Sequence, residues 1–551
     1  MINIKTRWVI IFSFLYSWCW ILPLHNPPWM SFYSDAWAAG IALIGGGFIL
    51  VNNKNNIYKT NFTLPAIIIL IISGQYFLNL ITSAGIAWIN LIYIGGFFLT
   101  ILIGRAWGNR KSLSGGNFLF FSVFFGGIFS LLIQLHQLFS LEIFGDFIIR
   151  QNGNRFAANI GQPNQLGTLF LLSCLGCAWL YIKKYINRWV LLCSCILFLL
   201  GAALTQSRTV WVNVFFLLSI FLFKNKITEI KKLIPIILLL IFIYFSFVFL
   251  IPAAISTIKS DVIGEIEIRP FKDSARITIW KVYLEALMEK PFFGYGWGQV
   301  SHVQLFGRNH YEEANSGVLF LQSHNLIFDI LLWNGLLIGI PIIIFFSFWL
   351  FIVFNKLKSI DDLLIFCFLS VLIIHSFFEF PLHYAYFIIL FGLAVGIIDA
   401  KITFFKTIQL NKTTIYIYYA LILCLFFKIL KEYNHLENEF YKLRLSFNGI
   451  KNVENFNSGD VILLAHLRDY IYFARIDPKN NHSMDNIEFG ERVISSYPTT
   501  LGIYKLILMY FYAGNFQKAN EWYSTLKKIS NENQINYIDS EFKKNEIVLD
   551  K

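Results

Sequence analysis

Residues 322–354 read QSHNLIFDILLWNGLLIGIPIIIFFSFWLFIVF, and they take the chain from a polar loop into a long apolar run. The apolar part is long enough to cross the hydrocarbon core of a bilayer, which is about 30 Å thick. We predict a membrane-spanning helix over residues 334–354. A Ser-His-Asn triplet stands before it at residues 323–325. The stretch raises two questions: which side of the membrane His324 faces, and what it does there.

The composition places the whole chain in the same class. Apolar residues occupy 56% of the 551 positions and charged residues only 14%, whereas about 25% of the residues in an average soluble domain are charged. The mean hydropathy is +0.59, and apolar runs of roughly 18 or more residues recur along the chain. We predict an all-α polytopic membrane protein with about 12–13 transmembrane helices.

The distribution of basic residues gives the predicted spans an orientation. The spans cover residues 7–24, 36–52, 62–80, 87–104, 117–136, 165–182, 189–205, 209–223, 233–251, 334–354, 363–378, 384–400 and 414–430. If residue 1 lies in the cytoplasm, lysines and arginines concentrate in the inside loops, and the short outside loops carry only Arg150, Arg155 and Arg208. This asymmetry fixes the orientation by the positive-inside rule. It also explains much of the net charge of +12, so no nucleic-acid partner is expected.

Two polar regions divide the chain into four predicted segments. Residues 1–251 form an N-terminal transmembrane bundle, 252–333 a large periplasmic loop, 334–430 the C-terminal transmembrane helices and 432–551 a soluble helical domain. With thirteen spans this domain lies outside, whereas with twelve it would be cytoplasmic. Residues 504–529 read as helix–turn–helix and resemble one tetratricopeptide hairpin. A single hairpin cannot bury its own face, so we expect it to pack on other helices, as a stabilising cap or a protein-docking surface.

Polar residues other than lysine collect at the outside ends of the spans. They form five clusters, which are residues 22–35, residues 150–167, residues 205–209, parts of the long loop (272–280, 291–299 and 322–325) and residues 375–387. Polar groups near the membrane core are energetically costly and usually face a cavity or a functional site. The convergence of separate segments on one face therefore predicts a site at the periplasmic surface of the membrane.

The residue types in these clusters indicate an anionic substrate. Arg155, Arg208 and Arg276 each carry a planar guanidinium that can hold a phosphate through two hydrogen bonds. They suit a lipid phosphate or pyrophosphate, although each arginine alone could be an ordinary residue that reaches the membrane interface. His324 is the candidate general base, because imidazole changes its protonation near neutral pH. The alternative is a structural histidine at the mouth of a span.

Metal and nucleotide chemistry are not predicted. His375, Glu379 and His383 are spaced four residues apart, but Pro381 interrupts a helix there and the sequence has no HExxH pattern. Glu379 is expected instead to orient a neighbouring group or to pair with an arginine. Because Walker and GxGxxG motifs are also missing, a reaction outside the cytoplasm needs an activated lipid-linked donor or an ion gradient.

Several of these clusters resemble a known family. The boxes that carry the resemblance are Asn159-Ile-Gly-Gln-Pro-Asn-Gln-Leu-Gly167, Leu204-Thr-Gln-Ser-Arg-Thr209, Pro291-Phe-Phe-Gly-Tyr-Gly-Trp297, Ser323-His-Asn325 with Trp333-Asn-Gly335, and Glu379-Phe-Pro-Leu-His-Tyr384. With the segment from His25 to Phe32 and the C-terminal domain, they resemble bacterial O-linked protein oligosaccharyltransferases of the PglL or pilin-glycosylase type. That family belongs to the O-antigen ligase and polymerase superfamily. The resemblance covers nearly the whole chain.

The resemblance implies the substrates. The donor would be an oligosaccharide on undecaprenyl (polyprenyl) pyrophosphate at the periplasmic leaflet of the bacterial inner membrane, and the acceptor a Ser or Thr of a pilin or other exported protein. No metal and no other cofactor is expected. His324 corresponds to the family's essential loop histidine, and Arg208 and Arg276 match positions associated with pyrophosphate binding. The further predicted substrate-binding residues are Arg155, Gln162, Asn164, Gln206, Asn325, Glu379 and His383.

In the predicted mechanism, His324 accepts the proton of the acceptor hydroxyl, whose oxygen attacks and inverts the anomeric carbon. Arg208 and Arg276 stabilise the charge on the departing pyrophosphate. An O-antigen ligase, which transfers glycan to lipid A-core, or an O-antigen polymerase would use the same donor chemistry with another acceptor. A polysaccharide transporter is a more remote alternative, since transporters more often show internal repeats and spans broken at mid-membrane.

Overall fold

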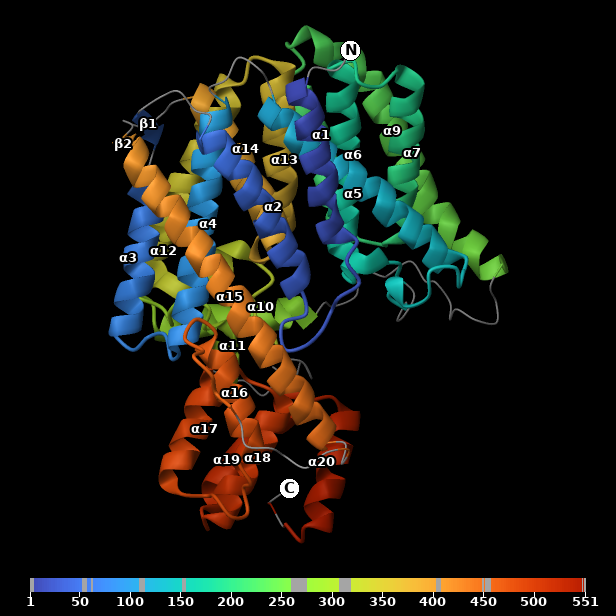
Figure 1. Cartoon of the computed structure of the whole chain (residues 1–551). Coiled ribbons are helices and arrows are strands. Elements are labelled where there is room, and N and C mark those ends of the chain that lie inside the picture. Colours follow the sequence, from blue (N-terminus) through green and yellow to red (C-terminus); the bar gives the residue numbers. More distant parts are fainter. Residues whose placement is uncertain are drawn as a thin grey trace. The chain divides into compact units, whose positions relative to one another are not determined.

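A helix forms at each of the thirteen predicted spans. The computed structural model describes residues 4–51, 57–60, 63–108, 114–150, 155–258, 275–306, 319–402, 408–447, 450, 457–547 and 549. The helices at the predicted spans are α1 Ile4–Ser17, α2 Phe32–Val51, α3 Thr63–Phe77, α4 Ala84–Gly108, α5 Ser114–Leu138, α6 Pro163–Ile182, α7 Arg188–Leu204, α8 Arg208–Phe223, α9 Thr228–Ile258, α12 Leu326–Lys356, α13 Ile360–Ser376, α14 Ala385–Lys401 and α15 Lys412–Phe447 (Figure 1). The prediction of an all-α membrane protein is confirmed.

Seven of the described helices are long and apolar enough to cross a bilayer. These are α2, α4, α5, α6, α9, α12 and α15. The other predicted spans fall on shorter helices, so the full count of thirteen crossings stays a prediction. The sequence did not predict a short antiparallel ladder, in which β1 (Ile57–Thr60) pairs with β2 (Ile408–Asn411). These strands follow α2 and precede α15 in loops that the charge pattern places inside.

The chain divides into two compact units. Unit 1 comprises residues 1–62, 96–272 and 347–420, and unit 2 comprises residues 63–95, 273–346 and 421–551. The boundaries fall inside α4, α12 and α15, so each of these helices contributes one part to each unit.

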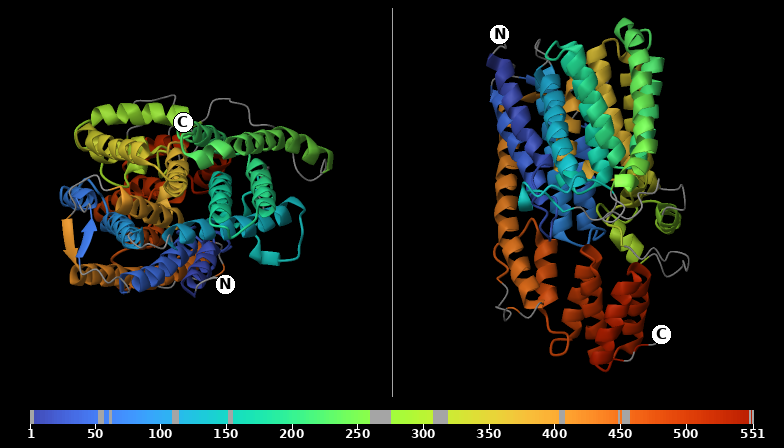
Figure 2. Two further views of the ribbon diagram at one scale, coloured as in Figure 1. Left: turned by 90° about the horizontal axis from the view of Figure 1, so that it is seen from above. Right: turned by 90° about the vertical axis from the view of Figure 1, so that its right-hand side faces the viewer.

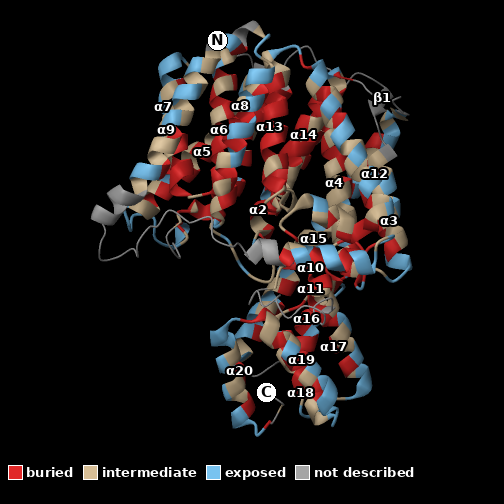
Figure 3. Ribbon diagram, turned by 180° about the vertical axis from the view of Figure 1, so that it is seen from behind, coloured by how far each residue is buried: buried red, intermediate tan, exposed pale blue. Residues whose placement is uncertain are grey.

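Helix α6 forms the centre of unit 1. It has no charged residue between Pro163 and Ile182, and 78% of its apolar stretch is buried (Figure 3). An apolar composition suits contact with lipid as well as with protein, so the burial of α6 comes from the helices around it. α5, α7, α8 and α13 pack around it, and α1 packs on α5. Figure 2 shows α1, α5 and α6 running side by side.

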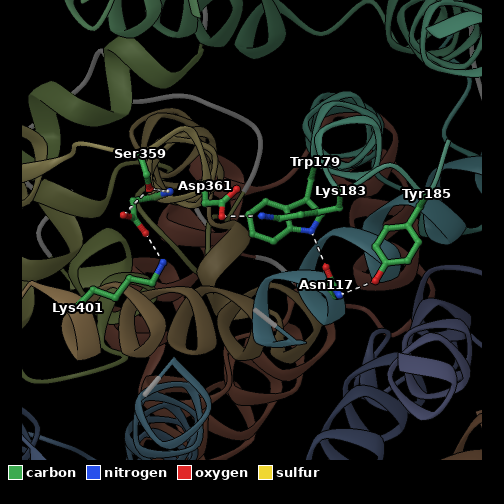
Figure 4. A network of polar contacts seen from close by, with 8 residues as sticks. Asn117, Trp179, Lys183, Tyr185, Ser359, Asp361 and Lys401 are labelled. Atoms are coloured by element: carbon green, nitrogen blue, oxygen red, sulfur yellow. Dashed lines mark hydrogen bonds and ion pairs between the residues drawn. The ribbon is translucent and has the colours of Figure 1, made fainter. Parts of the chain in front are cut away.

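Ion pairs join the start of α13 to the C-terminal ends of α6 and α14 in unit 1. Lys183 Nζ, directly after α6, lies 2.6 Å from Asp361 Oδ2, and Lys401 at the end of α14 pairs with Asp362 (Figure 4). Both acids lie in the first turn of α13, where the helix dipole stabilises negative charge. These contacts neutralise lysines that the sequence placed in inside loops.

Unit 2 builds one core from distant parts of the sequence. α3, the first part of α4, α10 (Ala275–Glu289), α11 (Val300–Phe306) and the first part of α12 contribute to it. α12 begins at Leu326, before the predicted span, and Gly335 has φ 67° and ψ −178°. Because these angles are not helical, α12 consists of two helical segments joined at Gly335.

The soluble region of unit 2 is helical, as predicted. It contains α16 Ala465–Arg475, α17 Met484–Ser496, α18 Thr500–Tyr512, α19 Phe516–Ile529 and α20 Glu532–Lys544. α18 and α19 form the expected hairpin, and Gly514 between them has φ +77°. α16 and α17 pack on α18, so the hairpin does bury its apolar face against other helices.

The C-terminal helices pack on the loop side of unit 2. α17 contacts α11, and α16 begins against Gly85, the second residue of α4. A Cβ on Gly85 would lie 2.6 Å from the backbone nitrogen of His466. Burial away from water lowers the pKa of His466 to about 4, so its ring is neutral in this contact at physiological pH. The missing side chain of Gly85 therefore permits the close approach of α16.

We expect Gly85→Ala to loosen this contact. The added methyl group overpacks a backbone position, which typically costs about 1–3 kcal/mol. Hydrogen–deuterium exchange measured by mass spectrometry should show faster exchange in residues 465–475. Gly96→Ala is the matched control in the same helix, because a Cβ there meets no atom within 4 Å and alanine is the better helix former. Equal exchange in both variants would contradict this packing.

Candidate functional site

Three predicted polar clusters meet at the N-terminus of α6 in unit 1. Gln162 is the N-cap of this helix, and its side-chain oxygen accepts a hydrogen bond of 2.8 Å from the backbone nitrogen of Gln165. Pro163 follows at the first helical position, where a proline costs no hydrogen bond. The Gln-Pro pair thus starts α6 at a fixed point. It places the next residue, Asn164, in the buried part of the first turn.

Asn164 links an arginine to a carboxylate. Arg155 donates through Nη2 to Asn164 Oδ1 at 2.8 Å and through Nε to the carbonyl oxygen of Thr205 at 2.9 Å. Asn164 Nδ2 donates to Glu379 Oε1 at 2.6 Å. We call these four residues the Arg155 cluster. The network brings together residues from three of the predicted polar segments, and Asn164 and Glu379 are both buried in it.

The turn between α7 and α8 packs on the same part of α6. Gly167 permits this, because a Cβ there would lie 2.6 Å from Val210 Cγ2 and 3.1 Å from Thr205 Oγ1. Gln206 adopts a left-handed backbone with φ +49°. Arg208, half-buried, is the first residue of α8, and the preceding N-cap, Ser207, makes no side-chain capping bond among the described residues. Backbone amides at a helix start attract anions, so this turn suits a phosphate group.

The N-terminal polar segment is tied to the same region. The His25 ring contacts the carbonyl oxygen of Asn159 through Nε2 at 2.8 Å, and burial lowers the pKa of His25. Asp35 accepts a hydrogen bond of 2.6 Å from the backbone nitrogen of Ala385, at the start of α14. Four of the five predicted polar segments are therefore joined within unit 1.

His375, Glu379 and His383 do not share a helix face, because α13 ends at Ser376. His375 is buried, with Nδ1 2.9 Å from Thr168 Oγ1. His383 lies in a short 3-10 turn, with its ring centre 5.9 Å from that of Phe380. Within the described ranges, no three His, Cys, Asp or Glu side chains are arranged to hold a metal ion.

In unit 2, the Gly-rich turn caps the break in α12. The backbone nitrogens of Tyr295 and Gly296 donate to the carbonyl oxygens of Leu332 and Trp333 at 2.7 and 3.1 Å. Gln75 of α3 also donates to Trp333 O, at 2.8 Å. The kink at Gly335 removes these carbonyls from the regular helical pattern, and a broken helix near a membrane needs such substitutes. The GYG and WNG boxes therefore form one structural element.

The Ser-His-Asn triplet forms the N-terminal cap of α12. Asn325 Oδ1 accepts from the backbone nitrogen of Ile327 at 2.9 Å. His324 is half-buried and has φ +57°, in the left-handed region. A residue other than glycine in a sparsely populated backbone region costs about 1–3 kcal/mol, and such residues cluster at functional sites. The imidazole lies edge-on to Phe320, with ring centres 5.1 Å apart.

Arg276 is the second residue of α10, but its side chain lies outside the described part of the structure. Sequence reasoning missed Gln75, Trp280, Gln304 and Asp329, which all hold the backbone of the loop. Gln75 offered a signal, since a glutamine inside an apolar span is costly unless it has a role. The other three carried no distinguishing pattern.

Comparison with known proteins gives matches over most of the chain. Residues 193–343 match a family described as O-antigen ligase, and residues 363–535 match one described as the C-terminal part of a virulence factor membrane-bound polymerase. The chain is 25% identical to the general O-oligosaccharyltransferase of Acinetobacter baylyi over 540 residues, which is 95% of this chain and 92% of that protein. It is 26% identical to the ComP-specific O-oligosaccharyltransferase of the same organism over 398 residues, or 66% and 71% of the two chains.

The left-handed backbone at His324 predicts an unusual order of stability for its glycine and alanine variants. Glycine is unstrained at φ +57°, whereas alanine is not, so His324→Gly should be more stable than His324→Ala by about 1 kcal/mol. Thermal unfolding of the detergent-solubilised variants measures the difference without any assay of activity. His383 is the control, since its φ is not positive, and there Ala should be at least as stable as Gly. The same order at both positions would contradict the left-handed backbone.

Proposed function

Because the chain belongs to the O-antigen ligase superfamily, we propose that it is a protein O-oligosaccharyltransferase. It transfers an oligosaccharide as one block from undecaprenyl pyrophosphate to a Ser or Thr of a pilin or another exported protein. The likeness to two O-oligosaccharyltransferases, one of them over nearly its whole length, supports a protein acceptor. The observation that carries the proposal is the meeting of four polar segments around the Arg155 cluster and the start of α8.

The proposed reaction gives each group a role. An imidazole nitrogen of His324 accepts the proton of the acceptor hydroxyl as its oxygen bonds to the anomeric carbon. The bond from that carbon to the pyrophosphate oxygen breaks, and the electron pair leaves with the polyprenyl pyrophosphate. Arg208 and Arg276 stabilise this leaving group. The donor binds through Arg155, Gln162, Asn164, Gln206, Glu379 and His383, and Asn325 binds the acceptor side.

In this proposal the site and the C-terminal domain face the periplasm across the bacterial inner membrane. The start of α4 lies on the outside by the charge pattern, and α16 packs against it. The strand β2 that precedes α15 pairs with β1, next to the lysines of an inside loop. One crossing by α15 then brings the domain outside. These contacts support an odd number of spans.

The test is intact mass spectrometry of pilin and other periplasmic proteins from cells with the chain, without it, and with His324→Ala or Arg208→Lys. A positioned general base contributes about 10²–10⁴-fold, so a glycan-sized mass should disappear from the acceptor with His324→Ala. Arg208→Lys should reduce it, because an ammonium group cannot make the bidentate contact of a guanidinium.

Lipopolysaccharide from the same cells separates the alternatives. If protein masses stay constant and the O-chains disappear, the acceptor is lipid A-core and the protein is an O-antigen ligase. Shortened O-chains would indicate a polymerase. Normal glycan on the acceptor in His324→Ala cells would overturn the assignment of the base.

A further inference from the structure

His324 lies on a short segment that three helices hold in place. At its start, Gln304 of α11 accepts a hydrogen bond of 2.7 Å from the backbone nitrogen of Phe320 through Oε1. At its end, Asn325 caps α12. Between them, the backbone of Ser323, fully buried, makes hydrogen bonds in two directions. The segment is therefore fixed at both ends and directly before the histidine.

The two bonds to Ser323 come from side chains on different helices. Asp329, in the first turn of α12, accepts from the Ser323 nitrogen through Oδ1 at 3.0 Å. Trp280 of α10 donates through Nε1 to the Ser323 carbonyl oxygen at 2.8 Å. The Trp280 ring also packs against Phe328, with ring centres 5.9 Å apart. Both peptide groups of Ser323 are thus held by side chains.

A helix cap does not require these two bonds. Asn325 alone satisfies the first free amide groups of α12, and Ser323 Oγ already donates to the Asn325 carbonyl oxygen at 2.7 Å. The bonds from Asp329 and Trp280 instead fix the residue that precedes a left-handed, non-glycine backbone. Such a conformation persists only where its surroundings determine it. The bonds from Asp329 and Trp280 hold His324 in this backbone conformation.

We propose that Asp329 and Trp280 are positioning residues for His324. They act through Ser323 and touch neither substrate, and they hold the imidazole in the one backbone conformation from which it accepts the proton. Trp280 stands four residues after Arg276 in α10, so the helix that holds the histidine segment also carries a predicted pyrophosphate-binding residue. This inference rests on the proposed role of His324 as the base.

The first test is a transfer assay with the purified full-length chain, a polyprenyl-pyrophosphate-linked oligosaccharide and an acceptor protein. Asp329→Leu removes the accepting oxygen and Trp280→Phe removes the donor but keeps a ring. Each should lower kcat about tenfold, the effect of about one buried hydrogen bond, with the donor KM within about twofold. Asp329→Asn retains an accepting oxygen and should restore most of kcat. Trp189→Phe, at an exposed tryptophan far along the chain, is the control.

The second test needs no transfer activity. Diethyl pyrocarbonate modifies accessible imidazoles, and peptide mass spectrometry measures its rate at His324 alone. The rate should rise several-fold in Asp329→Leu and Trp280→Phe and stay at the wild-type value in Asp329→Asn and Trp189→Phe.

The outcomes separate the two proposals. If His324→Ala is inactive while Asp329→Leu and Trp280→Phe keep the wild-type kcat and modification rate, the positioning proposal fails and the proposed function stands. If His324→Ala remains active, the base assignment fails, and with it the catalytic meaning of the positioning. The modification rates then still decide whether the two residues hold the histidine. An Asp329→Asn variant as impaired as Asp329→Leu would also contradict the hydrogen-bond argument.

Discussion

The carbonyl groups that Gly335 leaves without helical partners govern the structure of unit 2. Leu332 and Trp333 are buried, and a buried carbonyl needs a donor within the protein because neither water nor lipid supplies one there. The donors for Leu332 and Trp333 come from the Gly-rich turn at residues 295–296 and from Gln75 of α3. These bonds fasten the loop to the end of the membrane helix. α10, α11 and the segment that carries His324 belong to the same loop, and their side chains hold one another in turn.

Buried polar side chains also need hydrogen-bond partners, and this need accounts for the bonds within the Arg155 cluster. Elsewhere in unit 1, Lys183 and Lys401 pair directly with the carboxylates of α13, and each pair is locally neutral. In the Arg155 cluster, the Asn164 amide stands between the guanidinium and the Glu379 carboxylate and bonds to both. The two bonds of Arg155, to Asn164 and to the Thr205 carbonyl oxygen, orient its guanidinium. An oriented guanidinium is what a phosphate or pyrophosphate group requires, since both bidentate bonds depend on its plane.

The sequence predicted those features that depend on local pattern. Long apolar runs located the helices, and the charge pattern gave them a predicted orientation. It could not predict the β1–β2 ladder, because two short strands that lie far apart in the chain carry no local signal. It placed the start of the tenth span at residue 334, whereas α12 begins at Leu326, because a shorter helical segment precedes the break at Gly335.

In the candidate site, too, the sequence predicted individual residues but not the contacts between distant segments. Residue type and position at the ends of spans selected Arg155 and Glu379, and the family resemblance selected Asn164, although only the fold reveals that they form one network. Asp329 and Trp280 could not be selected, because an acid in a first helical turn and an aromatic residue in an amphipathic helix are ordinary features. Both residues matter because they bond to the backbone of Ser323. The bond from Trp280 forms only because the fold brings together two segments that lie about forty positions apart in the sequence.

The C-terminal domain also supports the segment that carries His324. α11 has only seven residues, and isolated helices shorter than about 12 residues are marginal in water, so it needs packing partners to persist. α17 of the C-terminal domain is one of them. α11 in turn supplies Gln304, which holds Phe320, and the Phe320 ring contacts His324. A continuous series of contacts within unit 2 thus leads from the soluble domain to the histidine, and the domain stabilises the segment on which the proposed chemistry depends, whatever else binds to its surface.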